Sequence, residues 1–182
     1  MSNPHNPAVT LDAATAADAA LIGELIELYA LELSAVFPNV VRGSDGRFGY
    51  SRLPLYWSEP ERRFAFLIRA DGAVAGFALA TRGSPAAADP DFLDVAEFFV
   101  LRPYRRLGVG RRAAWLLWDR LPGPWTVRVA EANREGLAFW ADAVGAVAPA
   151  ATVTALVSPN SLTSWRVYTF EALNGDIVGR TR

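Results

Sequence analysis

Hydrophobic positions in this chain follow two spacings, one typical of amphipathic helices and one typical of strands. Helical spacing marks residues 15–36, where Thr15 and Asp18 form a capping pair, residues 109–120 and residues 133–144. Runs typical of strands lie at Ala8–Asp12, Phe64–Arg69, Ala73–Thr81, Val95–Leu101, Trp125–Ala130, Val153–Val157 and Trp165–Glu171. Strands and helices are therefore mixed along the chain, which predicts an α/β (α+β) fold.

The connections between these segments differ in character. Ala70-Asp71-Gly72 joins two strand runs and is typical of a tight hairpin turn. Residues 38–62 are irregular, and they carry the aromatic side chains Phe48, Tyr50, Tyr56 and Trp57. A long aromatic connection of this kind is either packed cover for the core or the rim of a binding site.

The stretch from Asp94 to Arg120 contains a strand, a basic turn with glycines, and a helix, in that order. Pro103 ends the strand, because proline cannot donate to a sheet ladder. Gly108 and Gly110 let the backbone come close to a ligand at the helix start, where unpaired N–H groups favour an anion. Positive charge around the turn comes from Arg105, Arg106, Arg111 and Arg112. The pattern predicts a pyrophosphate-binding turn.

One interpretation of this turn is a dinucleotide-binding motif. Gly108, Gly110 and Ala113 satisfy the pattern G-x-G-x-x-G/A, and Glu131 follows near the end of the next apolar run. However, residues 102–107 separate the strand from the first glycine, whereas a dinucleotide turn follows its strand almost directly. Few residues remain for the further units of a doubly wound sheet. A Rossmann-type NAD(P) oxidoreductase is therefore the weaker interpretation.

The same segment resembles motif A of the GNAT superfamily, the acyl-CoA-dependent N-acetyltransferases. The matching positions are Val100, Pro103, Tyr104, Arg105, Gly108 and Gly110, which stand at the family's spacing. A second segment, residues 133–140 followed by Gly145, is similar to the family's Asn-x-x-Ala-x-x-Phe-Tyr…Gly segment. Two motifs in the expected order favour this family.

The length of the chain and the resemblance both indicate a single domain over residues 1–182, and the polar, proline-bearing residues 1–7 predict a disordered tail. The resemblance implies a mixed, largely antiparallel sheet of about seven strands, flanked by helices and splayed at a bulge between its central strands. It also implies acetyl-CoA as the cofactor. The residues expected to bind it are Phe99, Val100, Leu101, Arg105, Arg106, Leu107, Gly108, Val109, Gly110, Arg111 and Asn133.

Glu97 is the predicted catalytic residue. It lies in the central strand just before Val100, where a carboxylate could take a proton from an ammonium group. An acid within an apolar strand needs a partner, so the alternative is a residue that faces solvent or pairs with an arginine such as Arg128. Asp94 and Glu131, near strand ends, are further candidates.

Trp140 departs from the family pattern, which often has a tyrosine there as the acid for the leaving thiolate. An indole N–H does not usefully give up its proton. The acid is then another group, such as Tyr168 or water, or no acid is needed because a thiolate is a tolerable leaving group. Trp140 also lies on the apolar stripe of its helix, as a core residue would. A non-catalytic acyl-CoA-binding domain is therefore an alternative to an N-acetyltransferase.

The amino-acid composition limits the kinds of function and partner that the chain can have. The 182 residues include no cysteine, which excludes a disulfide framework and a cysteine nucleophile, and no metal site is predicted. The net charge of −1 gives no sign of a nucleic-acid or membrane partner. No secretory signal and no apolar run of membrane-spanning length is found, so a cytoplasmic protein is expected. The expected partner is a small-molecule, amino-acid or peptide amine, and the family often forms homodimers.

Overall fold

The computed structural model describes residues 6–157 and 163–172, so most of the expected tail, residues 1–5, lies outside the described residues. The strands are β1 (Val9–Ala13), β2 (Arg63–Ala70), β3 (Ala73–Arg82), β4 (Leu93–Val100), β5 (Gly123–Ala130), β6 (Thr152–Val157) and β7 (Ser164–Ala172). The α-helices are α1 (Ala19–Leu33), α2 (Leu55–Ser58), α3 (Val109–Arg120) and α4 (Arg134–Gly145). None of the helices in these described ranges is long and apolar enough to cross a bilayer.

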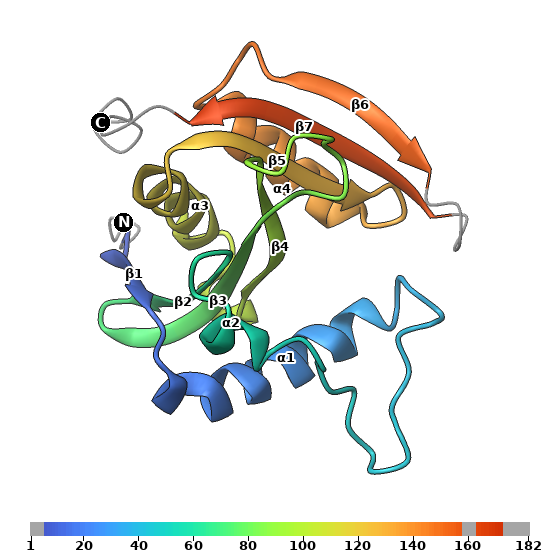
Figure 1. Cartoon of the computed structure of the whole chain (residues 1–182). Helices are drawn as coiled ribbons and strands as arrows, with labels where there is room; N and C mark the ends of the chain where they lie inside the picture. The colour runs from blue at the N-terminus through green and yellow to red at the C-terminus, as the bar shows by residue number, and fades with distance from the viewer. Residues whose placement is uncertain (1–5, 158–162, 173–182) are drawn as a thin grey trace.

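All of these strands join one sheet in the order β1-β2-β3-β4-β5-β7-β6 (Figure 1). β4 and β5 run parallel, whereas the other neighbouring pairs are antiparallel. α3 and α4 pack on one face of the sheet, and α1 and α2 pack on the other. The mixed, largely antiparallel sheet expected from the sequence is confirmed. It excludes the doubly wound dinucleotide fold, whose sheet is mostly parallel.

The two faces of the sheet follow from the alternation of side chains along its strands. On β2, Phe66 and Ile68 belong to the core that includes α3 and α4, whereas Leu67 belongs to the core that includes α1. β3 alternates in the same way, with Ala78 in the first core and Phe77 in the second. Two apolar cores, one on each face, therefore hold the helices against the sheet.

Most element boundaries agree with the sequence-based predictions, and the differences are local. α1 ends at Leu33 rather than near Val36, because the backbone continues as a tight turn in which the Val36 N–H donates to the Leu33 carbonyl. The irregular segment 38–62 contains the short helix α2. At the predicted hairpin, Asp71 and Gly72 both have positive φ angles of 49° and 80°, as a two-residue type I′ turn requires.

A bulge in β4 decides which face of the sheet carries Glu97. The register with β3 shifts between Val95 and Glu97, which leaves Ala96 as an extra residue. Val95 belongs to the core with α3 and α4, whereas Phe99 belongs to the core with α1. Without the bulge, Glu97 would point to the same face as Val95. With it, Glu97 points to the face of Phe99 and α1.

Beyond the bulge, β4 separates from its parallel neighbour β5 (Figure 1). The two strands pair only at Leu93–Trp125 and Asp94–Thr126. The rest of β4 therefore has no ladder partner on the side of β5. The splay of the central strands that the sequence implied is confirmed, and it opens the middle of the sheet to a ligand.

Candidate active site

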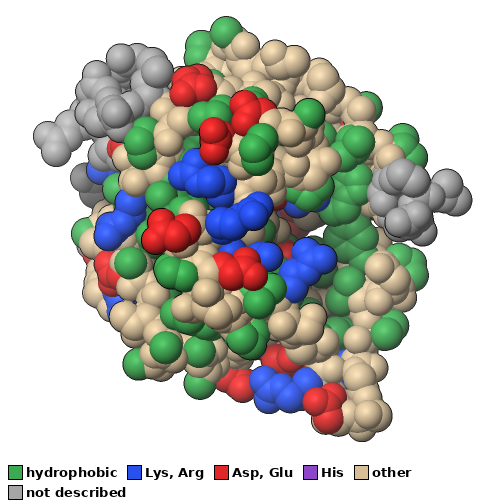
Figure 2. Space-filling model, viewed as in Figure 1, with side chains coloured by type: hydrophobic (Ala, Val, Ile, Leu, Met, Phe, Trp, Pro, Cys, Tyr) green, Lys and Arg blue, Asp and Glu red, His purple; other side chains and the backbone are tan. Residues whose placement is uncertain are grey.

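A cavity of about 330 Å³ opens beside the bulge, on the face of the sheet that carries α1 and α2. β4 contributes Asp94, Ala96 and Glu97 to its lining, and segment 38–62 contributes, among others, Tyr50 and Tyr56. The arginines that line it are Arg52, Arg62, Arg63, Arg82 and Arg128. Basic side chains gather among acidic ones in the middle of the face seen in Figure 2. The volume lies at the small end of the range for small-molecule sites.

Glu97 is partly buried, and four neighbouring residues act on its carboxyl group. Burial raises the pKa of Glu97 above its ordinary value, and the Asp94 charge adds to the rise. Interactions with the Tyr29 and Tyr50 phenols and the charge of Arg128 oppose it. Burial and the nearby Glu97 carboxylate in turn raise the pKa of both tyrosines, so each phenol keeps the proton that it can donate. A carboxyl group of raised pKa that lines a cavity is suited to general-base chemistry.

Arg128 forms its ion pair with Asp94 rather than with Glu97. Its Nε and Nη2 donate to the two Asp94 carboxylate oxygens at 3.0 and 2.7 Å. The Thr126 hydroxyl donates to the same carboxylate at 2.7 Å and the Ser84 hydroxyl at 3.3 Å, and Asp94 is only 1% exposed. Asp94 is thus occupied by a buried network, which leaves Glu97 as the β4 carboxylate that faces the cavity and has no ion pair among the described residues.

The start of α3 presents unpaired backbone donors. Gly108 caps the helix with a φ of 76°, and Arg106 has a φ of 61°. In the described part of the chain, the N–H groups of residues 106–111 find no acceptor. Gly110 lies so close to Phe139 of α4 that a Cβ atom there would be 3.1 Å from the ring. Unpaired N–H groups at a helix start, approached over glycine, fit a phosphate.

The arginines of this turn differ in how far they are already paired. Arg105 donates to the Glu32 carboxylate at 2.8 Å and, through Nε, to a β4 carbonyl at 2.7 Å. Arg111 donates to Asp142 of α4 at 3.3 Å. Arg106 is exposed and has no ion pair or hydrogen bond within the described residues. Among these three predicted phosphate contacts, Arg106 is therefore the one whose guanidinium is available.

The other predicted cofactor contacts are backbone groups or helix ends. The Leu101 N–H already donates to a β3 carbonyl at 2.8 Å, so by alternation the N–H of Val100 points toward the gap beside β5. Phe99 and Val109 have buried side chains, whereas Leu107 is exposed on the turn.

Asn133 is the N-terminal cap of α4. Its Oδ1 accepts a hydrogen bond from the Gly136 N–H at 2.9 Å. This bond leaves the side-chain NH₂ group as its donor for a ligand.

Trp140 packs in the core and does not line the cavity. It is 8% exposed, and its ring centroid lies 5.1 Å from that of Phe98. Tyr168, on β7, is 5% exposed. Glu131 pairs with Arg166 at 3.1 Å. Neither of the two acid–base alternatives, Tyr168 and Glu131, lines the cavity that contains Glu97.

Sequence reasoning missed Tyr29 and the arginine lining of the cavity. Tyr29 lies at helical spacing with the apolar Ile22 and Leu25, and its phenol oxygen is the one sign in the sequence that this face also serves a polar group. The arginines come from separate segments and share no spacing, so the fold alone brings them together.

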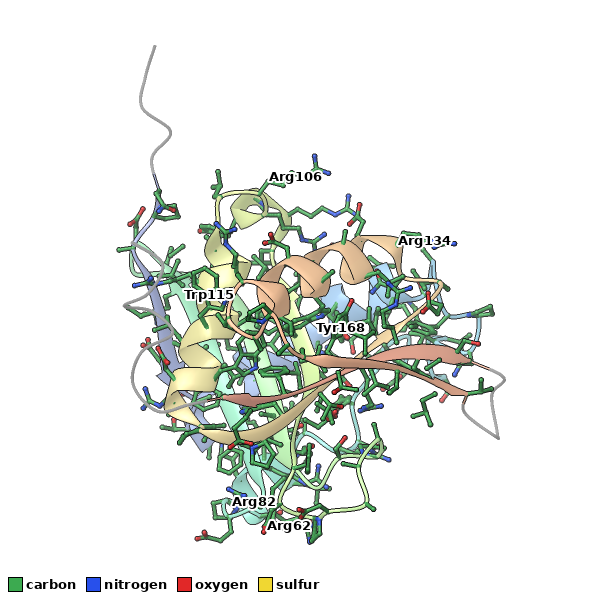
Figure 3. All side chains as sticks on the ribbon, turned by 90° about the horizontal axis from the view of Figure 1, so that it is seen from above. Arg62, Arg82, Arg106, Trp115, Arg134 and Tyr168 are labelled. Carbon is green, nitrogen blue, oxygen red and sulfur yellow. The ribbon has the colours of Figure 1, made fainter. Side chains whose placement is uncertain are left out.

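The turn before α3 and the cavity lie on opposite sides of the molecule. Figure 3 shows Arg106 and Arg134 on one side and Arg62 and Arg82 on the other, with Tyr168 between them. Two ligands could therefore enter from opposite sides and meet where β4 and β5 separate.

Comparisons with known proteins agree with this geometry. Residues 25–145 match the model of the acetyltransferase (GNAT) family. No curated protein matches the chain. The fold is similar to that of an acetyltransferase from Thermus thermophilus, at 19% identity and a TM-score of 0.59, over 91% of this chain and 99% of that one.

Two further solved structures share the fold. Spermidine N-acetyltransferase from Vibrio cholerae, solved with CoA and spermine, is 11% identical, with a TM-score of 0.62 over 90% of this chain and 95% of that one. Ribosomal-protein-S18-alanine N-acetyltransferase from Escherichia coli is 16% identical, with a TM-score of 0.58 over 93% of this chain and 97% of that one. Because the family match runs from α1 to the end of α4, and so includes the splayed strand and its turn, the chain belongs to the acetyltransferase (GNAT) family.

Proposed function

We propose that this acetyltransferase transfers the acetyl group of acetyl-CoA directly to a primary amine, with both substrates bound at once. The observation that carries the proposal is the Glu97 carboxylate, which the bulge turns into a cavity beside the gap between β4 and β5. Similar folds were solved with CoA bound. The chain has no cysteine, which favours direct transfer over a thioester on the enzyme.

On one side of the gap, the chain fits the cofactor. The unpaired N–H groups of residues 106–111 and the Arg106 guanidinium would bind the pyrophosphate. The Val100 N–H and the Asn133 side chain would bind the extended arm that leads to the thioester. Acetyl-CoA supplies the acetyl group in activated form. Its C–S bond breaks as the C–N bond forms, CoA leaves as a thiolate, and the second proton that the nitrogen loses passes to that thiolate or to water.

On the other side, Glu97 prepares the acceptor. Its carboxylate takes a proton from the ammonium group, which exposes the nitrogen lone pair for attack. The Tyr29 and Tyr50 phenol groups interact with the carboxylate and favour its charged form. A small molecule or the end of a peptide suits a cavity of about 330 Å³. The proposed reaction uses no side-chain acid, since a thiolate is a tolerable leaving group.

The test is the Glu97→Gln variant, which keeps the size of the side chain and removes its basicity. For an amine that the unmodified protein acetylates, we expect kcat/KM to fall by about 10²- to 10⁴-fold. The fall in rate that protonation of Glu97 should cause at low pH in the unmodified protein should also disappear. Calorimetric titration should give an unchanged Kd for acetyl-CoA, because Glu97 lies on the acceptor side.

Glu171→Gln is the matched control, because Glu171 is exposed on β7 and does not line the cavity. It should leave both the rate and its pH dependence as they are. Full activity in Glu97→Gln would remove Glu97 from the mechanism. Failure to acetylate any amine, with acetyl-CoA bound, would overturn the proposed reaction.

A further inference from the structure

The cavity beside Glu97 has more arginines than its acidic groups can pair. Arg128 is bound by Asp94 at 2.7 Å, and Arg63 is bound by Glu59 at 2.7 Å. These two ion pairs leave Glu97 as the one remaining acidic group in the lining. Three lining arginines take no part in these two ion pairs: Arg52, Arg62 and Arg82.

Two of these three arginines are adjacent. The Arg82 N–H donates to the Arg62 carbonyl at 2.7 Å, and the Arg62 Nη2 would lie 3.2 Å from a Cβ atom on Gly83. The Arg82 Nη1 donates to the Asp91 carbonyl at 3.4 Å and lies 4.0 Å from the Asp91 carboxylate, whose side chain is 78% exposed. Such a long, exposed contact contributes little.

Arg52 and Arg62 lack any ion pair or hydrogen bond from their side chains within the described part of the chain. Figure 3 places the Arg62 and Arg82 side chains together on the acceptor side of the molecule. Guanidinium groups gathered in one cavity repel one another unless an anion lies between them. Arg52 and Arg62 are exposed and Arg82 is half-buried, so the guanidinium groups are accessible to a negatively charged ligand, which would offset their repulsion.

We propose that the acceptor is an amine that also carries an anionic group, a carboxylate or a phosphate, bound by Arg52, Arg62 and Arg82. The proposal rests on the proposed function and names its substrate class. The planar guanidinium donors match either oxyanion in a bidentate manner. The ammonium end of the same molecule then faces Glu97, the unpaired acid of the cavity.

This charge arrangement also predicts what the cavity rejects. A polyamine would bring several positive charges to three arginines and a single carboxylate, so like-charge repulsion should exclude it. A neutral-tailed amine would leave the arginines without a counter-charge. An amino acid or an aminoalkyl phosphate supplies both signs and is small enough for a cavity of about 330 Å³.

The experiment compares acceptors that differ only in the anion. A panel of amino acids is assayed with acetyl-CoA, each beside its own amide, and phosphoethanolamine is assayed beside ethanolamine, with spermidine as the polycation. We expect the anionic member of at least one pair to have a kcat/KM about 10- to 100-fold higher, the range of a charge-assisted hydrogen bond. A preference among the amino acids over their amides indicates a carboxylate, and a preference for phosphoethanolamine over ethanolamine indicates a phosphate.

Variants then assign the preference to the arginines. Arg62→Gln should raise KM for the preferred anionic acceptor about 10-fold or more, with little change for its neutral partner. Arg62→Lys should restore part of the preference, because it restores the charge. Arg120→Gln is the matched control, since Arg120 lies at the end of α3, away from the cavity.

The outcomes separate this inference from the proposed function. Equal turnover of anionic and neutral amines, or a preference for spermidine, would overturn the inference while the acetyltransferase reaction stands. If no amine is acetylated, the proposed reaction fails, and calorimetry with the same pairs on CoA-saturated protein still decides the inference. The inference is supported if the anionic member of a pair binds more tightly than the neutral one and this difference is lost in Arg62→Gln. Equal binding of the two members overturns the inference.

Discussion

Glu97 lies partly buried in the central strand of the sheet, although its carboxyl group must carry a negative charge to act as a base. The bulge at Ala96 turns it toward α1, where Tyr29 and Tyr50 meet its carboxyl group. Burial raises the pKa of Glu97, and the phenols with Arg128 only partly offset that effect. The residue is therefore less stable as a carboxylate than an exposed glutamate would be, and that instability makes it a stronger base.

Glu97→Gln should consequently stabilise the protein at alkaline pH. Because its pKa is higher in the folded state than in the unfolded chain, Glu97 contributes stability that is fully present below the unfolded value of about 4.3 and is lost as pH rises through the folded pKa. Glutamine is neutral at every pH and avoids this loss. Thermal melts should show a higher Tm for Glu97→Gln at pH 8 and about the same Tm at pH 4.

The same melts on Glu171→Gln provide the comparison, and this exposed change should shift Tm little at either pH. A lower Tm for Glu97→Gln at pH 8 would mean that the hydrogen bonds from Tyr29 and Tyr50 outweigh burial. The assignment of burial as the dominant influence on Glu97 would then be wrong.

At the scale of elements, the connection from β4 to α3 forms the phosphate-binding part of the site. β4 ends in an unpaired edge, the chain turns through residues with positive φ, and α3 begins with N–H groups that have no acceptor in the described residues. Arg105 ties this turn to α1 through Glu32. The turn is thus fixed before any ligand arrives, which lowers the entropic cost of binding.

Gly108→Val should weaken acetyl-CoA binding more than it weakens the fold. Valine at a φ of 76° costs about 1–2 kcal/mol, and the strain shifts the N–H groups that follow. Gly72→Val is the matched control, because Gly72 has a φ of 80° at the hairpin between β2 and β3. An added Cβ atom would meet nothing within 4 Å at Gly72 and only the Asn6 Oδ1 atom, at 3.5 Å, at Gly108.

Calorimetry should show a Kd for acetyl-CoA at least about tenfold higher in Gly108→Val and unchanged in Gly72→Val, with similar losses of Tm in the two. Equal Kd values in both variants would remove the turn from the cofactor site.

The sequence predicts these elements well where the signal is local. The turn at Asp71-Gly72, the start of α3 and the alternating strands all depend on neighbouring residues. The bulge at Ala96 has no local signature, so the face that carries Glu97 could not be chosen from the sequence. Arg105 was expected to bind phosphate because of its motif, but its ion pair with Glu32 joins residues far apart in the chain and appears only in the fold.

At the scale of the whole molecule, the splayed sheet divides the protein into two halves. β1 to β4 form one half and β5 to β7 the other, and only two residue pairs link β4 to β5. α3 and α4 contact each other across the gap, with Phe139 against Gly110. A ligand that enters the gap touches both halves, so cofactor binding and global stability should be coupled.

Acetyl-CoA should therefore raise the Tm of the protein, and NADH should not. A ligand at about 100 times its Kd that binds only the folded state adds about 2.7 kcal/mol, which is about 5 to 10 °C for a chain of this size. Hydrogen exchange reports the binding of acetyl-CoA at individual backbone amides.

The N–H groups of residues 106–111 have no acceptor in the described part of the chain and should become protected only with acetyl-CoA. If Tm rises while these amides exchange as before, the cofactor binds elsewhere. Stabilisation by NADH alone would mean that the turn serves a dinucleotide despite its fold.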